Sequence, residues 1–211
     1  MKIPKYARYD YCNKKACEFL EEYNINTFPV NVIDIIKKNC WGLTKYSEIM
    51  KELHCDRETV IRCLQSKDGF TLLDNDNYSI AYNDDEVLGN RIRFTLMHEI
   101  GHIYLNHLKD FEATKLLRNS LTNAENKILE NEANSFARNV LAPTFMIQQL
   151  KDKSLQNISI TFGISIAAAK TRLFFFDTDM NLNLNTGLIE RLKHIFYKYY
   201  YKKNVLPVEQ H

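Results

Sequence analysis

The residues best suited to chemistry in this chain are two histidines and a glutamate in the segment 98–102, which reads His-Glu-Ile-Gly-His. In an α-helix His98 and His102 would lie on one face, about 6 Å apart along the axis. Two imidazoles at that spacing can occupy two corners of a tetrahedral zinc site. Glu99 follows the first histidine, where its carboxylate can hold a metal-bound water. The pattern therefore predicts a catalytic zinc site, and the alternative is a pair of ordinary helix histidines.

The surrounding stretch, residues 93–108, predicts the helix that this site needs. One stripe of side chains recurs at steps of three and four residues and consists of Ile92, Leu96, Ile100, Ile103 and His107. The helix is apolar nearly all round, which is typical of a buried helix. Burying two histidines and a glutamate is costly without polar partners, and a metal ion would supply one. Gly101 costs about 1 kcal/mol of helix propensity against alanine, which is explained if a second backbone passes close to it.

A catalytic zinc site usually has three protein ligands, so a third must come from elsewhere in the chain. The nearby candidates are His107, Asp110, Glu112, Glu125, Glu130 and Glu132. Glu130 is favoured because small residues such as Ala133 share its helix edge and would let that helix approach Gly101. Glu132 is the second choice, with a possible role as a partner that orients one of the histidines. Asn134 is placed to hydrogen-bond the Glu130 carboxylate.

The rest of the chain predicts an α+β fold, a mostly helical single domain over residues 1–211 with one small antiparallel β-hairpin. Apolar periodicity and caps indicate helices over 11–23, a segment opened by Pro29, 47–53, 56–66, 123–141, two helices within 154–176, and 187–203. The polar stretches 109–122 and 177–186 are predicted as loops. We place the core at about 28–173 and a C-terminal helical extension at about 177–211.

The hairpin comes just before the helix that carries the histidines. Residues 70–73 and 78–82 read as strands joined by a polar turn, because Tyr78, Ile80 and Tyr82 alternate with small residues. An edge strand beside a zinc cleft can hold an extended peptide by main-chain hydrogen bonds. We therefore expect the second strand, 78–82, to hold the substrate.

The composition is that of a soluble globular protein. The net charge of +2 is too small to argue for nucleic acid by itself. No apolar run is long enough to span a membrane, and the start of the chain lacks the apolar region of a secretory signal, so we expect a cytoplasmic protein. Five cysteines without a Cys-x-x-Cys pair favour reduced thiols over a cysteine zinc site: Cys12, Cys17, Cys40, Cys55 and Cys63.

Two segments, 47–66 and 154–176, have the rhythm of a helix-turn-helix, which can read DNA. The cations that they offer are few: Arg57, Arg62 and Lys67 in the first, and Lys170 and Arg172 in the second. We therefore predict that both segments are packing elements and that the protein has no direct contact with nucleic acid. The basic, tyrosine-rich helix 187–203 is of a kind that binds RNA or membranes, but a docked helix with a solvated basic face is commoner.

Two blocks of this sequence resemble the ImmA/IrrE family of zincin-like metallopeptidases. The family pattern is roughly R-F-T-x-x-H-E-x-G-H, followed by E-x-E-A-N-x-F-A-x-x-L-x-P. The matching residues are Arg93, Phe94, Thr95, His98, Glu99, Gly101 and His102 in the first block, and Glu130, Glu132, Ala133, Asn134, Phe136, Ala137, Leu141 and Pro143 in the second. Shorter similarities extend the resemblance over most of residues 28–173, and the segment after about Leu173 resembles nothing that we can name.

The resemblance implies a zincin-like core in which His98, His102 and Glu130 hold Zn2+ and Glu99 is the general base. Family members are typically encoded in phages and integrative elements. There they relieve repression by cleaving a helix-turn-helix repressor, or act in stress-response regulation. The resemblance therefore implies such a repressor as protein substrate, cut at a specific site.

Peptide-bond hydrolysis is the activity that we expect. Zinc would lower the pKa of its bound water towards 7 and polarise the scissile carbonyl, and Glu99 would carry the water proton to the leaving amine. A tyrosine or histidine from elsewhere in the chain would stabilise the oxyanion. Two alternatives remain. One is a catalytically silent, zinc-bound regulator, anti-repressor or antitoxin-like, that acts by binding a protein partner. The other is a DNA-binding protein that uses residues 154–176.

Overall fold

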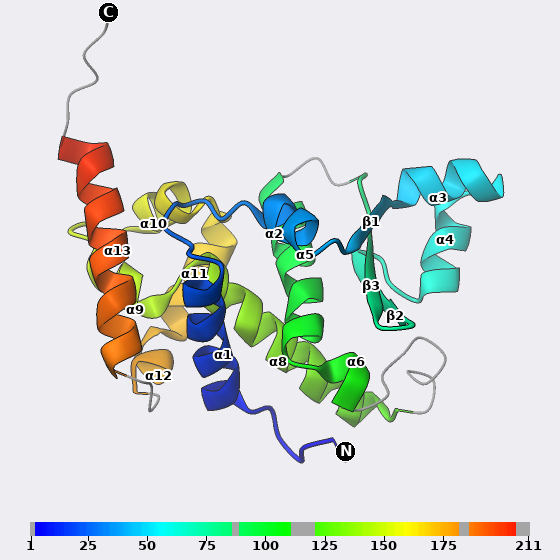
Figure 1. Cartoon of the computed structure of the whole chain (residues 1–211), viewed down its shortest axis with the longest axis horizontal. Helices are drawn as coiled ribbons and strands as arrows, with labels where there is room; N and C mark the ends of the chain where they lie inside the picture. Colours follow the sequence, from blue (N-terminus) through cyan, green and yellow to red (C-terminus); the bar gives the residue numbers. More distant parts are fainter. Residues whose placement is uncertain (1–2, 86–88, 111–120, 182–185, 206–211) are drawn as a thin grey trace, which may run out of the picture. The chain divides into compact units, whose positions relative to one another are not determined.

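The computed structural model describes residues 3–85, 89–110, 121–181 and 186–205 (Figure 1). The chain divides into two compact units, the first made of Met1–Cys12 and Asn31–Ala137, the second of Asn13–Val30 and Arg138–His211. Helices α1 (Tyr9–Glu22) and α8 (Asn123–Leu141) contribute residues to both units. Helices predominate and one small sheet accompanies them, so the predicted α+β class is confirmed.

The first unit contains a three-stranded mixed sheet in the order β1-β3-β2. Strands β2 (Gly69–Asp74) and β3 (Asn77–Tyr82) form the predicted antiparallel hairpin. The two turn residues, Asn75 and Asp76, have φ angles of 45° and 64°. Positive φ at both positions is the geometry of the type I′ turn that matches the twist of a hairpin. Strand β1 (Gly42–Lys45) was not predicted, and it pairs in parallel with β3.

Strand β1 changes the role of β3, because β3 is paired on both sides. Its residues Ser79–Tyr82 face β1, and its whole length faces β2. The prediction that residues 78–82 hold an extended peptide by main-chain hydrogen bonds is therefore wrong, since those groups are already engaged. The pairing leaves β2 as an edge strand of the sheet within the described residues.

The free side of β2 follows from its register. The Asn83 N–H donates to the Asp68 carbonyl at 2.9 Å, just beyond the paired end of the hairpin. Along an antiparallel ladder, residues whose backbone N–H and C=O point towards the partner strand alternate with residues whose groups point away from it. The backbone groups of Gly69, Thr71 and Leu73 consequently point away from β3, but Gly69 and Thr71 are buried, and the Gly69 N–H donates to Ser66 Oγ at 3.3 Å.

Helix α5 (Gly89–Tyr104) carries the two histidines and packs against β2, β3 and α2 (Val32–Lys38) (Figure 1). Its apolar side chains Leu96, Met97, Ile100 and Ile103 are buried, as the periodicity predicted. The helix ends earlier than expected, because Asn106 adopts a left-handed φ of 58°. His107 therefore begins a separate short helix, α6 (His107–Asp110), and does not extend the stripe of α5.

Helices α3 (Tyr46–Leu53) and α4 (Arg57–Leu64) form the first helix pair, which is fastened to the end of β3. The Ser47 N–H donates to Asp84 Oδ1 at 3.1 Å, and Arg57 donates to the Asn83 and Asp84 side chains. Asp56 caps α4 as predicted, whereas Ser47 lies inside α3 and caps nothing. One of the three cations of this segment is thus engaged within the protein, which supports a packing role.

The second unit is helical throughout its described residues. Beyond the shared α1 and α8 it contains α9 (Thr144–Ile147), α10 (Leu155–Phe162), α11 (Ile166–Phe174), α12 (Phe176–Met180) and α13 (Thr186–Val205). Helices α10 and α11 form the predicted pair, with Ser154 and Ser165 as N-caps and Gly163 at φ 63° between them. Helix α12 falls within the stretch expected to be a loop, so that prediction is wrong at 177–180.

A buried arginine holds several helices of the second unit together. The Arg172 side chain is 2% exposed, and its Nε donates to the Ala142 carbonyl at 2.6 Å. Its Nη atoms donate to Asn139 at 2.7 Å, to Asp179 and to Thr144. Burial lowers the pKa of Arg172 to about 10, against the opposing effect of Asp179. This cation is therefore inaccessible to DNA phosphates, which counts against the DNA-reading alternative.

The cysteines and the helices agree with the remaining expectations. All five cysteines are free thiols, as predicted, with Cys12 and Cys17 buried and Cys40 and Cys63 exposed. Burial raises the pKa of the Cys17 thiol to about 12. Among the described residues, no helix is both long and apolar enough to cross a membrane.

Candidate metal centre and active site

Three predicted metal ligands converge in the first unit. His98 and His102 extend from α5, and Glu130 extends from α8. The two Nε2 atoms lie 3.1 Å apart, and they lie 3.1 Å and 3.4 Å from the Glu130 carboxylate oxygens. One ligand atom from each residue lies within 4.8 Å of the others, and no other such group occurs in the described part of the chain.

Hydrogen bonds on the far side of each ring determine where its proton lies. His98 Nδ1 is 3.0 Å from Asn134 Oδ1, an atom that can only accept, so Nδ1 carries the hydrogen. His102 Nδ1 is 3.0 Å from Nδ1 of His107, whose Nε2 lies 3.1 Å from Glu132 Oε2. In both rings Nε2 is left with its lone pair facing Glu130.

The donor set therefore fits a metal ion. Two nitrogen lone pairs and a carboxylate face one another with no hydrogen between them when both imidazoles are neutral. Such groups repel unless a cation lies among them, and two imidazoles with a carboxylate are a common ligand set for catalytic zinc. The residues present thus match the chemistry of the predicted metal.

The pKa values of these groups move in the directions that a cation site requires. Burial lowers the pKa of His102 to about 3, which keeps that imidazole neutral. Burial also opposes the charged form of His98, but hydrogen bonding and charge from Glu130 outweigh it and raise the pKa. Burial acts against ionised Glu130 as well, yet hydrogen bonds from the two histidines hold its pKa far below the usual range.

Gly101 explains how the two helices come close enough to share a site. A Cβ at Gly101 would lie 3.2 Å from the Ala133 carbonyl oxygen, 3.3 Å from the Ala133 Cα and 3.2 Å from Phe136 Cδ1. These contacts are tighter than most real Cβ contacts. The predicted close passage of a second backbone is confirmed, and it involves the helix of Glu130.

Glu99 lies beside the proposed ligands and is only 5% exposed. The Thr71 hydroxyl of β2 donates to Glu99 Oε2 at 2.6 Å. A cavity of about 500 Å³ opens over Glu99, and its walls are formed by Gln65, Ser66, Asp68, Gly69, Arg91, Phe94, Thr95, His98, Glu99, Glu130 and Asn134. The carboxylate, one histidine and the glutamate of α8 thus face one space, which is large enough for a short peptide segment.

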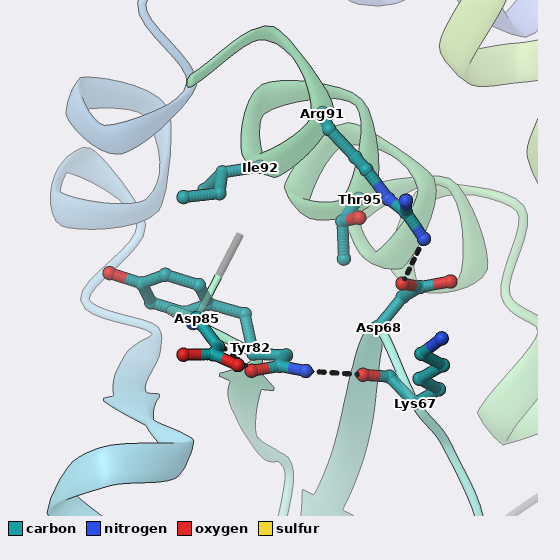
Figure 2. A pocket seen from close by; sticks show the side chains of 8 residues that line it. Lys67, Asp68, Tyr82, Asp85, Arg91, Ile92 and Thr95 are labelled. Atoms are coloured by element: carbon teal, nitrogen blue, oxygen red, sulfur yellow. Dashed lines mark hydrogen bonds and ion pairs between the residues drawn. The ribbon is translucent and has the colours of Figure 1, made fainter. Parts of the chain in front are cut away.

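A second cavity has a volume of about 140 Å³, and Figure 2 shows the side chains that line it. The two cavities share Asp68, Arg91 and Thr95 as wall residues. The Arg91 guanidinium binds Asp68 at 2.8 Å, so an ion pair stands between them (Figure 2). The walls of the larger cavity include no tyrosine among the described residues, although a tyrosine or histidine was expected to stabilise the oxyanion. The uncharged side-chain donors that they offer are Gln65, Ser66, Thr95 and Asn134, and Arg91 adds a cation.

The other candidate ligands lie elsewhere. Glu125 accepts from the Thr122 backbone at 2.8 Å near the start of α8, and Asp110 ends α6. Glu112 lies outside the described residues. His107 and Glu132 lie behind His102 and not at the metal position. The second-choice role of Glu132, to orient a histidine, matches its place in this chain of contacts.

Some features of the site escaped sequence reasoning. Asn134 was expected to bind Glu130 and instead contacts His98. Arg8 donates from Nε and Nη2 to the Glu132 carboxylate at 2.9 Å and 2.8 Å, across 124 positions of sequence. Thr71 was read only as a strand residue. No local pattern marks these two contacts, because both depend on how distant segments pack.

The helical His-Glu-x-x-His segment and a glutamate from a second helix define a metallopeptidase-like protein. A family model supports this conclusion: the Peptidase_M78 model, described as the IrrE N-terminal-like domain, matches residues 59–174. The match covers more than half of the chain, and the protein belongs to this family. The predicted ImmA/IrrE resemblance is thereby confirmed, although its upstream part from residue 28 lies outside the match. A search of curated proteins found no significant match.

Proposed function

We propose that this protein is a zinc-dependent peptidase that cleaves a protein substrate at a specific site. One observation carries the proposal: two imidazole lone pairs and a carboxylate converge where Glu99 faces the same 500 Å³ cavity. The protein class follows from the family, whereas the metal, the reaction and the substrate are proposals.

Each residue has a separate task in this proposal. His98, His102 and Glu130 hold zinc, which when bound supplies a Lewis acid that activates water and polarises a carbonyl. Glu99 takes a proton from the water in the cavity and delivers it to the leaving amine. The Thr71 hydroxyl donates to Oε2 of Glu99 and holds the carboxylate in one orientation.

The substrate binds along the free edge of β2 and not along β3. Gly69 lines the cavity, and Thr71 of the same strand contacts Glu99. A peptide bound there would replace the Ser66 hydroxyl, which accepts from the Gly69 N–H at 3.3 Å. A Cβ at Gly69 would lie 2.6 Å from Thr95 Cγ2 and 3.3 Å from Glu99 Oε1. Glycine therefore lets the edge strand approach α5, and an added peptide strand would pass over the catalytic carboxylate.

We infer a helix-turn-helix repressor of a phage or mobile element as the substrate. This step rests on the resemblance to the ImmA/IrrE family and on the burial of Arg172, which leaves Lys170 as the exposed cation of α11. A protein that relieves repression without binding DNA itself must act on the repressor.

A glutamate-to-glutamine exchange tests the proposal. Wild type, Glu99→Gln and the exposed control Glu52→Gln are each produced together with a helix-turn-helix repressor encoded beside the gene. Zinc content and new protein N-termini are measured by mass spectrometry. We expect zinc in all three proteins, and repressor cleavage at least about 100-fold slower in Glu99→Gln alone.

Two results would overturn the proposal. If Glu99→Gln relieves repression as fully as wild type, the protein acts by binding and is the catalytically silent regulator. If wild type binds zinc no better than Glu130→Gln does, the convergence of the three side chains has no role in metal binding.

A further inference from the structure

A buried line of side chains runs from His102 to the N-terminal segment. His102 Nδ1 lies 3.0 Å from His107 Nδ1, and His107 Nε2 lies 3.1 Å from Glu132 Oε2. Arg8 completes the line, since its backbone N–H and its guanidinium both donate to the Glu132 carboxylate. The His107 and Glu132 side chains are each 0% exposed. Water therefore cannot replace any contact in the middle of the line.

The direction of each hydrogen bond follows from the Arg8 end. A carboxylate that accepts a bidentate pair of hydrogen bonds from an arginine is ionised, so its oxygens can only accept hydrogen bonds. His107 must then donate from Nε2, which leaves its Nδ1 as an acceptor. The hydrogen between the two rings consequently belongs to Nδ1 of His102, and His102 Nε2 keeps a free lone pair.

We propose that Arg8, Glu132 and His107 are positioning residues that fix the tautomer and ring orientation of His102 for metal binding. The inference rests on the proposed zinc site. It makes residues near the N-terminus part of that site, although Arg8 touches neither the metal position nor the cavity. Partners of metal-ligating histidines commonly have this effect, and their loss typically weakens metal affinity about 10–100-fold.

The two histidines differ in how they are held. The Nδ1 of His98 contacts Asn134 and the His98 side chain is 13% exposed, whereas His102 is 3% exposed and its Nδ1 is held by three residues in series. A change at His107 or Arg8 should therefore alter the tautomer of His102, while Asn134 keeps the hydrogen of His98 on Nδ1. This selectivity separates a positioning role from a general loss of structure.

The test uses the full chain with three changes and one control. His107→Leu removes both hydrogen bonds of the ring, and His107→Gln keeps one donor and one acceptor. Arg8→Gln removes the charge at the end of the line, and Arg62→Gln changes an exposed arginine of α4 as the matched control. Zinc affinity is measured by competition with a chelator. The tautomers of His98 and His102 are measured from imidazole 15N chemical shifts in the zinc-free protein.

We expect zinc to bind about 10–100-fold more weakly to His107→Leu than to wild type. The zinc affinity of His107→Gln should be close to that of wild type. His102 should carry its hydrogen on Nδ1 in wild type and become a mixture of tautomers in His107→Leu and Arg8→Gln. His98 should keep its hydrogen on Nδ1 in every variant, because Asn134 accepts it.

Unchanged zinc affinity in His107→Leu, or a His102 ring in wild type with its hydrogen on Nε2, would overturn the proposal. If His107→Leu does not fold, Arg8→Gln and His107→Gln give the same comparison. Failure of the proposed zinc site can be distinguished from failure of this inference. In the first case wild type itself would bind no zinc, and the tautomer measurement would still test the contacts from Arg8 to His102.

Discussion

Gly101→Ala is the change whose outcome the structure defines most closely. The new methyl group would lie 3.2–3.3 Å from the Ala133 backbone and from Phe136. Backbone atoms cannot rotate away, so α8 must move by a few tenths of an ångström. Overpacking of this kind costs about 1–3 kcal/mol, and the better helix propensity of alanine returns about 1 kcal/mol. The net loss is about 1 kcal/mol, which lowers the Tm of a chain of this size by about 2–4 °C.

The same movement should weaken metal binding, because Glu130 lies one turn before Ala133 on α8. Metal–ligand distances tolerate changes of only about 0.2 Å. We therefore expect zinc to bind about tenfold more weakly to Gly101→Ala than to wild type. Thermal unfolding of the zinc-free protein measures the first effect, and chelator competition measures the second.

Gly89→Ala is the matched control on the same helix. A Cβ at Gly89 would meet nothing within 4 Å, so alanine should leave the Tm unchanged or slightly higher and should not change zinc affinity. The reasoning is refuted if Gly101→Ala behaves like Gly89→Ala in both measurements. In that case the close approach of the two helices would not hold Glu130 in place.

Three further outcomes are expected. Thr71→Val removes the hydrogen bond to Glu99, which is worth about 1.5–3 kcal/mol for a charged acceptor. The kcat/KM for peptide cleavage should therefore fall about 10–100-fold while zinc affinity stays unchanged. An equal fall in zinc affinity would contradict this expectation. Asp179→Ala leaves the Arg172 charge buried without its ionic partner. Urea denaturation should show that the free energy of unfolding falls by about 3–5 kcal/mol. A fall below about 1 kcal/mol would show that the ion pair is dispensable. Burial opposes ionised Glu132, but hydrogen bonds from its partners lower its pKa to about 2 in the folded protein, against about 4.3 when unfolded. Its ionised form thus stabilises the fold above about pH 5 and loses this effect as the pH falls towards 2. Zinc-free wild type should therefore lose stability between about pH 5 and pH 2 more steeply than Glu132→Gln, and parallel stability curves would exclude this contribution.

Local patterns predicted the helices well. The expected helix 123–141 coincides with α8, because an apolar stripe with a following proline marks both of its ends. The caps Asp56 and Ser165 were also located from sequence, since a cap acts on a backbone N–H only three residues away, whereas the N-cap of α3 is Lys45 and not Ser47. These signals depend on neighbours in sequence and need no knowledge of the fold.

Contacts between distant segments were not predictable in this way. The four residues of β1 carry no alternating pattern, and their partner strand begins more than thirty positions later. His107 fits the apolar period of α5, but the helix ends before it because Asn106 has a left-handed φ. The His107 side chain instead contacts Nδ1 of His102. Glu130 was identifiable because small residues beside it matched a glycine on the partner helix. No residue pattern in the sequence matched Arg8 to Glu132 in this way, so their contact was not predicted.

Binding along the edge of β2, if the proposed peptidase activity is correct, would place a demand on the protein that is cut. A strand edge accepts only a main chain whose own hydrogen bonds are open, so a helical target must first unfold locally over the scissile segment. The turnover of a folded target then depends on how often that segment opens, and each 1.4 kcal/mol of added local stability would slow cleavage about tenfold. A condition that loosens the target would thereby trigger its destruction with no change in the enzyme.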